Sequence, residues 1–459
     1  MLQAINPSTG QPLEAFPSIS TDELATRVEA AAEAFRDWRK QGFAQRAAVL
    51  EAVAARMDKD EERLALLMTD EMGKPIKEAR AEVQKAAWCA RHYAEHAEQY
   101  LAPIDLPSDA THSYVQHLPL GPVLGILPWN APFWLAFRFC APALMAGNTC
   151  LMKHDPHVPA CAAAIAGLFI EAGAPANIFQ NLPLENPDVE AAIRHPKVRA
   201  VSFTGSSAAG ARVAAIAAAE IKPVVLELGG SDPAIVLADA NLDEAADTLV
   251  LSRTINAGQS CIAAKRIIVE APVYESMVEK LGERLAALTV GNPRDEQNQV
   301  GPIARPDLRD NLARQVERTI ASGARCLMGG EALSGDGYYY PVTLLADVDT
   351  SMAAACEETF GPVAVVMKAA SLDAALAIAN DTEYGLAAAL WCAPERAESL
   401  ASEVAREIEA GQVAVNGIVK TDPRLPSGGI KRSGLGRELG PHGILEFVNA
   451  QQVWVGPKT

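Results

Sequence analysis

The chain has 459 residues, of which 49% are apolar and only 5% are aromatic. This length suits two or three domains, which bury a large core without disulfides or structural metal ions. Acidic residues outnumber basic residues by 57 to 40 and give a formal charge of −17. Such a surface repels phosphate backbones and argues against nucleic acid as a partner.

The N-terminal sequence MLQAINPSTG lacks the basic and apolar regions of a signal peptide, and the eight cysteines form no CxxC pair. We therefore expect a cytoplasmic protein without a disulfide framework and without a metal site. The apolar segment 131–152 is about as long as a bilayer is thick, but it contains Arg138, two prolines and a Gly-Asn pair. We predict a buried helix running into a strand there, and no membrane partner.

The N-terminal third shows helical periodicity. Apolar residues recur at three- and four-residue steps over 22–39 and again over 45–72, which predicts two amphipathic helices. Met72-Gly-Lys-Pro75 ends the second pattern, with Gly and Pro in the positions usual for a helix end.

From about residue 121 short apolar runs alternate with Ala-rich helical stretches. The runs are 121–127, 149–153, 198–203 and 224–228 in a first series, and 234–238, 266–270, 363–367 and 412–416 in a second. This alternation predicts an α/β fold with two tandem units, one for a cofactor and one for catalysis. The join lies near Gly229-Gly230, and a helix over 241–256 follows it.

Two residues are candidates for chemistry. Cys261 follows the polar, Gly-containing sequence Asn256-Ala-Gly-Gln-Ser and should lie on a loop, where it is either an inert thiol or a nucleophile. Glu227 ends an apolar strand and needs a partner or a role if it is buried. It is either a capping or ion-paired residue or a general base at the carboxyl end of a strand.

Three further segments follow predicted strands. Ser202-Phe-Thr-Gly-Ser-Ser-Ala-Ala-Gly210 opens a helix whose N–H groups suit a phosphate, although its spacing is neither GxGxxG nor a P-loop. Lys153 is either a surface residue or a ribose ligand. Asn130 is either a turn residue or an oxyanion donor.

These segments, in this order, resemble the aldehyde dehydrogenase superfamily over essentially the whole chain. The matching motifs are Asn6-Pro-Ser-Thr-Gly10, Leu127-Pro-Trp-Asn130, Lys153, Phe203-Thr-Gly-Ser206, Glu227-Leu-Gly-Gly230, Gly258-Gln-Ser-Cys261, Glu357-Glu-Thr-Phe-Gly-Pro362, Asn380-Asp-Thr-Glu-Tyr-Gly385 and Ser433-Gly-Leu-Gly-Arg-Glu438. Each is moderately specific, and the ordered set is highly specific.

The resemblance implies a fold, a division into domains and an assembly. A Rossmann-like NAD(P)-binding domain would comprise residues 1–100 and 120–229, and an α/β catalytic domain residues 230–430. A small β extension for oligomerisation would combine residues 101–119 with 446–459. The family usually forms homodimers or homotetramers.

The resemblance also implies roles for individual residues. Cys261 would be the nucleophile, Glu227 the base that activates water, and the Asn130 amide would form an oxyanion hole with the Cys261 backbone N–H. The cofactor would be NAD or NADP, with Ser206 and Gly205 at the pyrophosphate, Lys153 and Glu358 at the riboses, and Phe360 beside the nicotinamide. The other cofactor-lining positions are Ile126, Leu127, Pro128, Trp129 and Leu228.

Within the superfamily the chain most resembles bacterial succinate-semialdehyde dehydrogenases. Three motifs of that group recur here: Lys153-His-Asp-Pro156, Glu227-Leu-Gly-Gly-Ser-Asp-Pro233 and Ala263-Ala-Lys-Arg266. Arg138 lies eight residues after Asn130, where the group places an Arg on the substrate carboxylate, and a buried Arg needs an anionic partner. The alternative is a pair with a protein Asp or Glu.

One position departs from the pattern. Some members carry a second substrate Arg six residues before the nucleophile, where this chain has Ile255. Carboxylate binding would then depend on Arg138, helped by Ser260 or the loop 420–424. This leaves a broad-specificity enzyme for neutral or aromatic aldehydes open. A CoA-acylating enzyme is a further alternative, disfavoured by Glu227. Pro156 replaces the Glu that repels a 2′-phosphate in NAD-preferring relatives, so neither cofactor is excluded.

Overall fold

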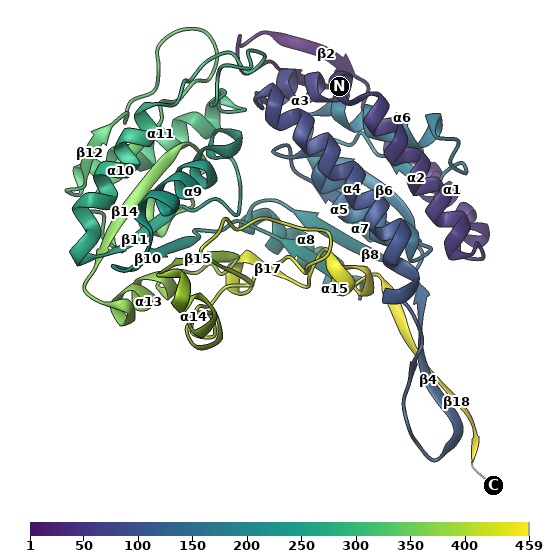
Figure 1. The fold of residues 1–459 in the computed structure, drawn as a ribbon. Coiled ribbons are helices and arrows are strands. Elements are labelled where there is room, and N and C mark those ends of the chain that lie inside the picture. The colour runs from purple at the N-terminus through teal and green to yellow at the C-terminus, as the bar shows by residue number, and fades with distance from the viewer. Residues whose placement is uncertain (458–459) are drawn as a thin grey trace.

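The computed structural model describes residues 1–457, in which two mainly parallel sheets and a protruding ribbon organise the chain (Figure 1). The first sheet has the strand order β17-β9-β8-β5-β6-β7. Neighbours from β9 to β7 are parallel, and only β17 pairs antiparallel. The strands are β5 (Pro122–Leu127), β6 (Thr149–His154), β7 (Phe179–Asn181), β8 (Ala200–Thr204), β9 (Val224–Glu227) and β17 (Gly434–Leu435).

The second sheet has the order β12-β13-β14-β11-β10-β15-β16 and is parallel apart from the pair of β12 and β13. Its strands are β10 (Pro233–Val236), β11 (Arg266–Glu270), β12 (Arg325–Met328), β13 (Thr343–Ala346), β14 (Val363–Ala369), β15 (Ala387–Trp391) and β16 (Gln412–Val415). The predicted α/β class is confirmed, and every apolar run singled out in the sequence contributes to a strand. Such runs are typical of strands buried on both faces.

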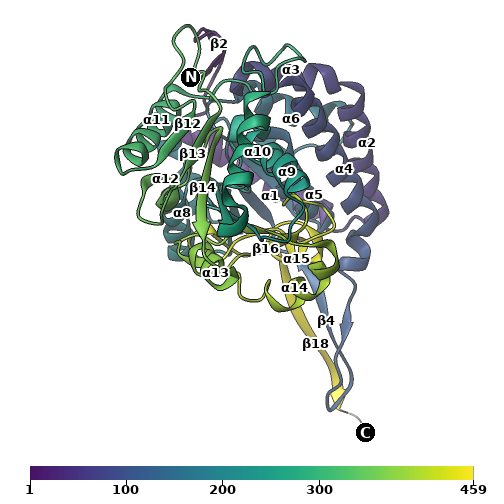
Figure 2. The ribbon, with the colours of Figure 1, turned by 60° about the vertical axis from the view of Figure 1, so that its left-hand side comes forward.

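Helices cover both sheets (Figures 1 and 2). Those of the N-terminal half are α1 (Thr21–Trp38), α2 (Phe43–Lys59), α3 (Glu61–Met72), α4 (Ile76–Tyr100), α5 (Pro132–Met145), α6 (Pro159–Glu171), α7 (Val189–Arg194) and α8 (Ser207–Ala219). Those of the C-terminal half are α9 (Leu242–Thr254), α10 (Tyr274–Ala286), α11 (Pro306–Ala321), α12 (Ala353–Cys356), α13 (Leu372–Asn380), α14 (Ala397–Glu403) and α15 (Gly440–Leu445).

The single helix predicted over 45–72 is wrong in one respect. The chain breaks at Asp60, whose φ of −103° and ψ of 11° leave helical geometry, so that α2 and α3 are separate. The predicted stop is confirmed, since Gly73 has a left-handed φ of 79°. A helix that the sequence analysis did not single out, α4, starts directly after Pro75 and packs against α2 and α5.

A ribbon of β3 (Ile104–Asp105), β4 (Ala110–Pro119) and β18 (Val448–Pro457) projects from the body of the molecule in both views (Figures 1 and 2). A short hairpin of β1 (Leu2–Ile5) and β2 (Pro12–Phe16) lies near the N-terminus. The largest apolar core joins α2–α6 to the first sheet, and two other cores lie on the two faces of the second sheet.

Across the described part of the chain no helix is long and apolar enough to cross a bilayer. Segment 131–152 instead forms α5 and most of β6, as predicted. All eight cysteines have free thiols.

Candidate active site

Cys261 lies on the loop between α9 and β11, and this loop has an unusual backbone. Asn256 and Ala257 have φ values of 55° and 52°, and Gly258 follows with 74°. A residue with a side chain loses about 1–2 kcal/mol in this conformation, so surrounding contacts must impose it. Position 258 requires glycine, because an added Cβ would lie 2.2 Å from the Gly361 carbonyl oxygen. Three residues further on, Cys261 keeps partial exposure.

Asn130 follows β5 and is held against the same loop. Its Nδ2 donates to the carbonyl of Gln259 at 3.2 Å, and its own carbonyl accepts from Asn256 Nδ2 at 2.9 Å. The structure therefore brings Asn130 from the first sheet to the main chain just before Cys261, although the two residues are 131 positions apart in the sequence numbering.

A buried polar cluster on α4 and the turn before it fixes this junction. Lys74 pairs with Glu82 and also donates to the Asn130 carbonyl at 2.9 Å. The other oxygen of Glu82 accepts the first N–H groups of α5, those of Phe133 and Trp134. These contacts satisfy donors at a helix start that would otherwise be buried without partners.

Glu78 belongs to the same cluster and contacts the Cys261 loop. Its Oε2 accepts the N–H of Asn256 at 2.7 Å, which supports the strained part of the loop. Burial raises the pKa of Glu78 to about 7, although this hydrogen bond and Lys74 lower it. Helix α4 thus holds the Asn130 turn and the Cys261 loop together.

On the other side of the site, two carboxylates share one guanidinium. Glu227 ends β9 and is 4% exposed. Arg138 of α5 lies 2.7 Å from Glu438 and 3.4 Å from Glu227. Burial opposes the charge of Arg138, but the two carboxylates outweigh it and keep its pKa above the usual range. Ser202 donates to the remaining oxygen of Glu438 at 3.2 Å.

These ion pairs change the argument for Arg138. Its burial called for an anionic partner, and Glu438 and Glu227 supply one. This is the alternative that the sequence left open, so burial no longer points to a substrate carboxylate. The substrate role of Arg138 stays a prediction based on the resemblance alone.

Burial favours the neutral forms of Cys261 and Glu227. Burial raises the pKa of Cys261 to about 11, with Lys265 and Arg138 lowering it and Glu227 and Glu358 raising it. Burial also raises the pKa of Glu227 to about 7, against the opposing charge of Arg138 and with the support of Glu438. A thiol in this state needs a base to become a nucleophile, and Glu227 is an acid that can release its proton near neutral pH.

Lys265, which the sequence analysis noted only as part of a subgroup motif, holds the main chain of the Cys261 loop. Its fully buried Nζ donates to the carbonyls of Cys261 at 2.6 Å and Ser260 at 3.0 Å. It also lies 3.5 Å from Glu358, whose other contact is the N–H of Gly230 at 3.1 Å. Ser260 therefore belongs to the nucleophile loop through its main chain.

The turn between β8 and α8 has the shape expected for a phosphate site. Ser206 caps α8, and Gly205 has no room for a side chain, because a Cβ would lie 2.7 Å from the Phe203 ring. At Gly210 a Cβ would meet Leu228 at 2.5 Å, so helix and strand approach closely. The N–H groups at the start of α8 suit the negative charge of a pyrophosphate.

The other predicted cofactor residues lie around the ends of these strands. Lys153 ends β6, is 3% exposed and donates to Asn186 at 2.6 Å. Burial lowers the pKa of Lys153, and no carboxylate of residues 1–457 lies within ion-pair distance of it. Phe360 meets Trp129 edge to face at 5.8 Å between ring centres. Ile126 and Leu127 are buried at the end of β5, and Pro128 follows them.

These observations fit a dinucleotide: a helix start for phosphates, glycines without room for side chains, and a buried lysine whose hydrogen-bond partner is neutral. Lys153 and Glu358 share no contact with each other, since Glu358 lies against Lys265 and Gly230. The sequence analysis did not assign Glu438, Lys74, Glu78, Glu82 or Lys85, which follows below. The spacing of Glu78, Glu82 and Lys85, which places them on one face of α4, was the available signal for these three.

Comparisons with known proteins find relatives that match almost the whole chain. The profile described as "Aldehyde dehydrogenase family" matches residues 1–453. A probable succinate-semialdehyde dehydrogenase (NADP(+)) of Synechocystis sp. is 48% identical, with 99% of each chain covered. Succinate-semialdehyde dehydrogenase (NADP(+)) 1 of Mycobacterium ulcerans is 47% identical, covering 98% of this chain and 99% of the relative. The structure of succinic semialdehyde dehydrogenase from Streptococcus pyogenes with NADP+ superposes with a TM-score of 0.96 over 100% of both chains at 33% identity.

Proposed function

Since the chain belongs to the aldehyde dehydrogenase family, we propose that it uses Cys261 to oxidise a short aldehyde bearing a carboxylate, with NADP as the preferred cofactor. Succinate semialdehyde is the substrate that the relatives' names favour. The chain is an NAD(P)-dependent enzyme that converts an aldehyde to a carboxylate; the residue roles and the substrate are the proposal.

The observation that carries the proposal is the convergence of three groups on one loop. Asn130 bonds to the main chain before Cys261, and the charges of Arg138 and Glu227 both act on the thiol. A nucleophile, a donor amide and a buried carboxylate are the parts that acyl transfer through sulfur requires.

The first step forms a bond between sulfur and carbon. Glu227 takes the thiol proton, and the Cys261 sulfur attacks the aldehyde carbon to give an alkoxide. The Asn130 amide and the Cys261 N–H donate to that oxygen, and removing such a donor typically costs about 3–4 kcal/mol. When bound, the dinucleotide supplies the acceptor for the hydride that leaves the carbon, and a thioester remains on Cys261.

The second step releases the acid. Glu227 first releases the thiol proton to solvent. It then withdraws a proton from water as the water attacks the thioester carbon, and Cys261 leaves as a thiolate that recovers this proton from Glu227. A pKa near 7 suits this role, because a useful fraction of Glu227 is ionised at neutral pH. The paired Glu438 and Arg138 lie next to Glu227 and stabilise either charge state.

The cofactor preference has two supports. The curated relatives named above carry NADP(+) in their names. In this chain Pro156 occupies the position where NAD-preferring relatives carry a repelling Glu, while Lys153 ends the preceding strand. Asp155, the carboxylate whose charge acts on Lys153, contacts His157, so Lys153 tolerates the additional phosphate of NADP.

A panel of aldehydes tests the proposed substrate class. We expect kcat/KM for succinate semialdehyde to exceed that for butyraldehyde, which lacks the carboxylate. We also expect kcat/KM with NADP to exceed kcat/KM with NAD. Equal values for acidic, neutral and aromatic aldehydes would indicate the broad-specificity alternative. Acyl-CoA as the main product in the presence of CoA would indicate the acylating alternative, which a buried Glu227 disfavours.

The ribbon supports a homodimer or homotetramer. It projects from the body and exposes Trp454 and Val455 of β18 and Ile104 of β3 at 45–53% of their surface. Exposed apolar side chains on a paired edge are typical of an interface. Light scattering on the protein and on Trp454→Asp tests this, and a monomer in both cases would reject it. The eight free thiols support a cytoplasmic location.

A further inference from the structure

Lys85 of α4 is a half-buried cation without an acidic partner. Its Nζ donates to Thr421 Oγ at 3.0 Å and lies 4.2 Å from the centre of the Trp134 ring. Within residues 1–457 no Asp or Glu oxygen lies at ion-pair distance from it. The two carboxylates whose charges reach it are already paired, Glu82 with Lys74 and Asp422 with Arg424.

This arrangement is unfavourable in the protein alone. Burial, together with the charge of Arg138, lowers the pKa of Lys85 to about 8. Two cations thus act on each other on this side of the site, while Arg138 is occupied by Glu438 and Glu227. Buried charges without partners are rare unless a ligand or a reaction needs them.

The position of Lys85 relative to the nucleophile follows from α5. Trp134 and Arg138 are four residues apart on this helix and share one face. Trp134 lies under Lys85, whereas the charge of Arg138 acts on Cys261. One turn of α5, a rise of about 5–6 Å, therefore separates the residue that contacts Lys85 from the residue whose charge acts on Cys261.

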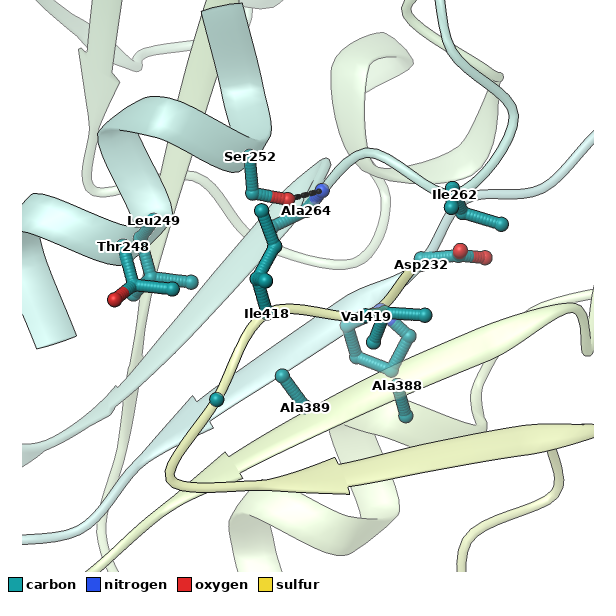
Figure 3. Close-up of a pocket in the computed structure, with 12 residues that line it drawn as sticks. Asp232, Thr248, Leu249, Ser252, Ile262, Ala264, Ala388, Ala389, Ile418 and Val419 are labelled. Atoms are coloured by element: carbon teal, nitrogen blue, oxygen red, sulfur yellow. Dashed lines mark hydrogen bonds between the residues drawn. The ribbon is translucent and has the colours of Figure 1, made fainter. Parts of the chain in front are cut away.

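The loop that carries Thr421 also lies near the Cys261 loop. Val419, two residues before Thr421, and Ile262, the residue after Cys261, line the same small cavity (Figure 3). Thr421 itself is 5% exposed and accepts the Lys85 hydrogen bond with its hydroxyl oxygen, so its own proton is available to another acceptor. Lys85 thus contacts a loop that shares a cavity with the residue following Cys261.

We propose that Lys85, with the hydroxyl of Thr421, receives the carboxylate of the substrate, and that Trp134 packs against the methylene groups between carboxylate and aldehyde. This inference rests on the proposed function and names the residue behind its substrate class. It also accounts for Ile255: the carboxylate has a cation without any contribution from that position. In this proposal Arg138 balances the negative charges of Glu227 and Glu438.

The test compares succinate semialdehyde with butyraldehyde in the wild type and in Lys85→Met, Lys85→Arg and Thr421→Val. A charge-assisted hydrogen bond contributes about 1.5–3 kcal/mol, so the acid-to-neutral ratio of kcat/KM should fall roughly 10- to 100-fold in Lys85→Met. The loss should appear in KM for succinate semialdehyde. Lys85→Arg should recover most of it, and Thr421→Val should lose about 3- to 10-fold. Lys77→Met, at an exposed position of the same helix, is the control and should match the wild type.

The outcomes separate the two proposals. A wild type without preference for the acidic aldehyde overturns the proposed substrate class and this inference together. A wild type with that preference and an unchanged ratio in both Lys85→Met and Thr421→Val overturns the inference alone. Equal losses for both aldehydes in Lys85→Met, without recovery in Lys85→Arg, would assign Lys85 a structural role and also reject it.

Discussion

Two buried charged clusters flank the Cys261 loop, and they differ in how their charges are matched. In the α4 cluster Lys74 pairs with Glu82, whose second oxygen accepts helix N–H groups, and Glu78 accepts from Asn256. In the cluster beside Glu227, two carboxylates share Arg138 and a lysine nearby has no acid.

The difference separates positioning from chemistry. The one-to-one pair of Lys74 and Glu82, with hydrogen bonds in fixed directions, holds one geometry at some desolvation cost. Glu78 beside this pair also has a pKa raised to about 7, but its Oε2 is engaged by the N–H of Asn256. Mismatched charges leave a carboxyl that titrates near neutrality and a cation that can take an anion. The first cluster carries the turn of Asn130 and the strained loop, and the second carries the groups to which we assign proton exchange and substrate binding.

The largest effect should come from Cys261, where the two clusters meet. Cys261→Ala removes the atom that carries the acyl group, so we expect NADPH formation to fall by about 10⁴-fold or more, to background. The exposed thiol of Cys356 is the control, and Cys356→Ala should keep wild-type turnover. Turnover that persists in Cys261→Ala would reject the assigned nucleophile and with it the meeting point of the two clusters.

Glu227 tests the mismatched cluster directly. In Glu227→Gln the thioester should form but hydrolyse slowly, so a burst of NADPH precedes a steady state about 10²–10³-fold slower than that of the wild type. Because the base must be ionised and burial raises its pKa to about 7, the wild-type rate should fall as pH drops below 7. In Glu227→Gln this acid limb should disappear.

Rapid-mixing measurements of NADPH over a pH series check both features. A full multiple-turnover rate in Glu227→Gln would contradict the role of the residue. An acid limb that survives the substitution would assign the titration to another group.

A substitution in the α4 cluster should instead lower the stability of the protein. Glu82→Gln leaves Lys74 buried without its carboxylate, and breaking such a pair typically costs about 3–5 kcal/mol. We expect a lower unfolding temperature and a slower kcat, because the Asn130 carbonyl and the start of α5 lose their support. Denaturant unfolding followed by circular dichroism measures the change.

Glu438→Gln is the matched control in the other cluster. It removes the surplus carboxylate while Arg138 keeps Glu227, so stability should change little. The acid limb of the rate should move to lower pH, since the charge of Glu438 helps to raise the pKa of Glu227. Equal losses of stability in Glu82→Gln and Glu438→Gln would erase the difference between the clusters.

The sequence predicts one part of this site and not the other. Eight strands of the two sheets follow from apolar runs, whereas β7, β12, β13, β15 and β17 were not predicted. Cys261, Glu227 and Asn130 stand out because each follows or precedes such a run. The α4 cluster escapes this reasoning, because Glu78 and Glu82 appear as ordinary charges on an amphipathic helix and Lys74 as a charge in the turn before it. Only the packing of α4 against α5 reveals that their face is buried.

Arg138 illustrates the same limit. Its burial was predictable from the apolar segment around it, but its partner was not, because Glu438 lies 300 positions later in the chain. Asp60 is a smaller case: helical periodicity continues across it, and only the backbone geometry there divides α2 from α3. Patterns local in sequence predict elements, whereas charge pairing is decided by contacts between distant segments.

The smallest expected effect concerns Lys85. Burial lowers the pKa of this lysine to about 8. The groups acting on it are Glu82 and Cys89 of α4, Arg138 of α5, and Asp422 of the loop after β16. As pH rises through 8 the ammonium loses its proton, so kcat/KM for succinate semialdehyde should fall about tenfold per pH unit above that point. Butyraldehyde has no carboxylate and should not show this fall.

The ratio of the two substrates is the proper measurement, because ionisation of Cys261, with a pKa of about 11, affects both alike. Lys85→Arg keeps its charge throughout this range, so its ratio should stay level between about pH 7 and 9. A wild-type ratio that is equally level would mean that no titrating cation meets the substrate, and the unpaired charge of Lys85 would then have no part in recognition. A ratio that falls with rising pH in the wild type alone would show that the unpaired charge of Lys85 contributes to the preference for the acidic aldehyde.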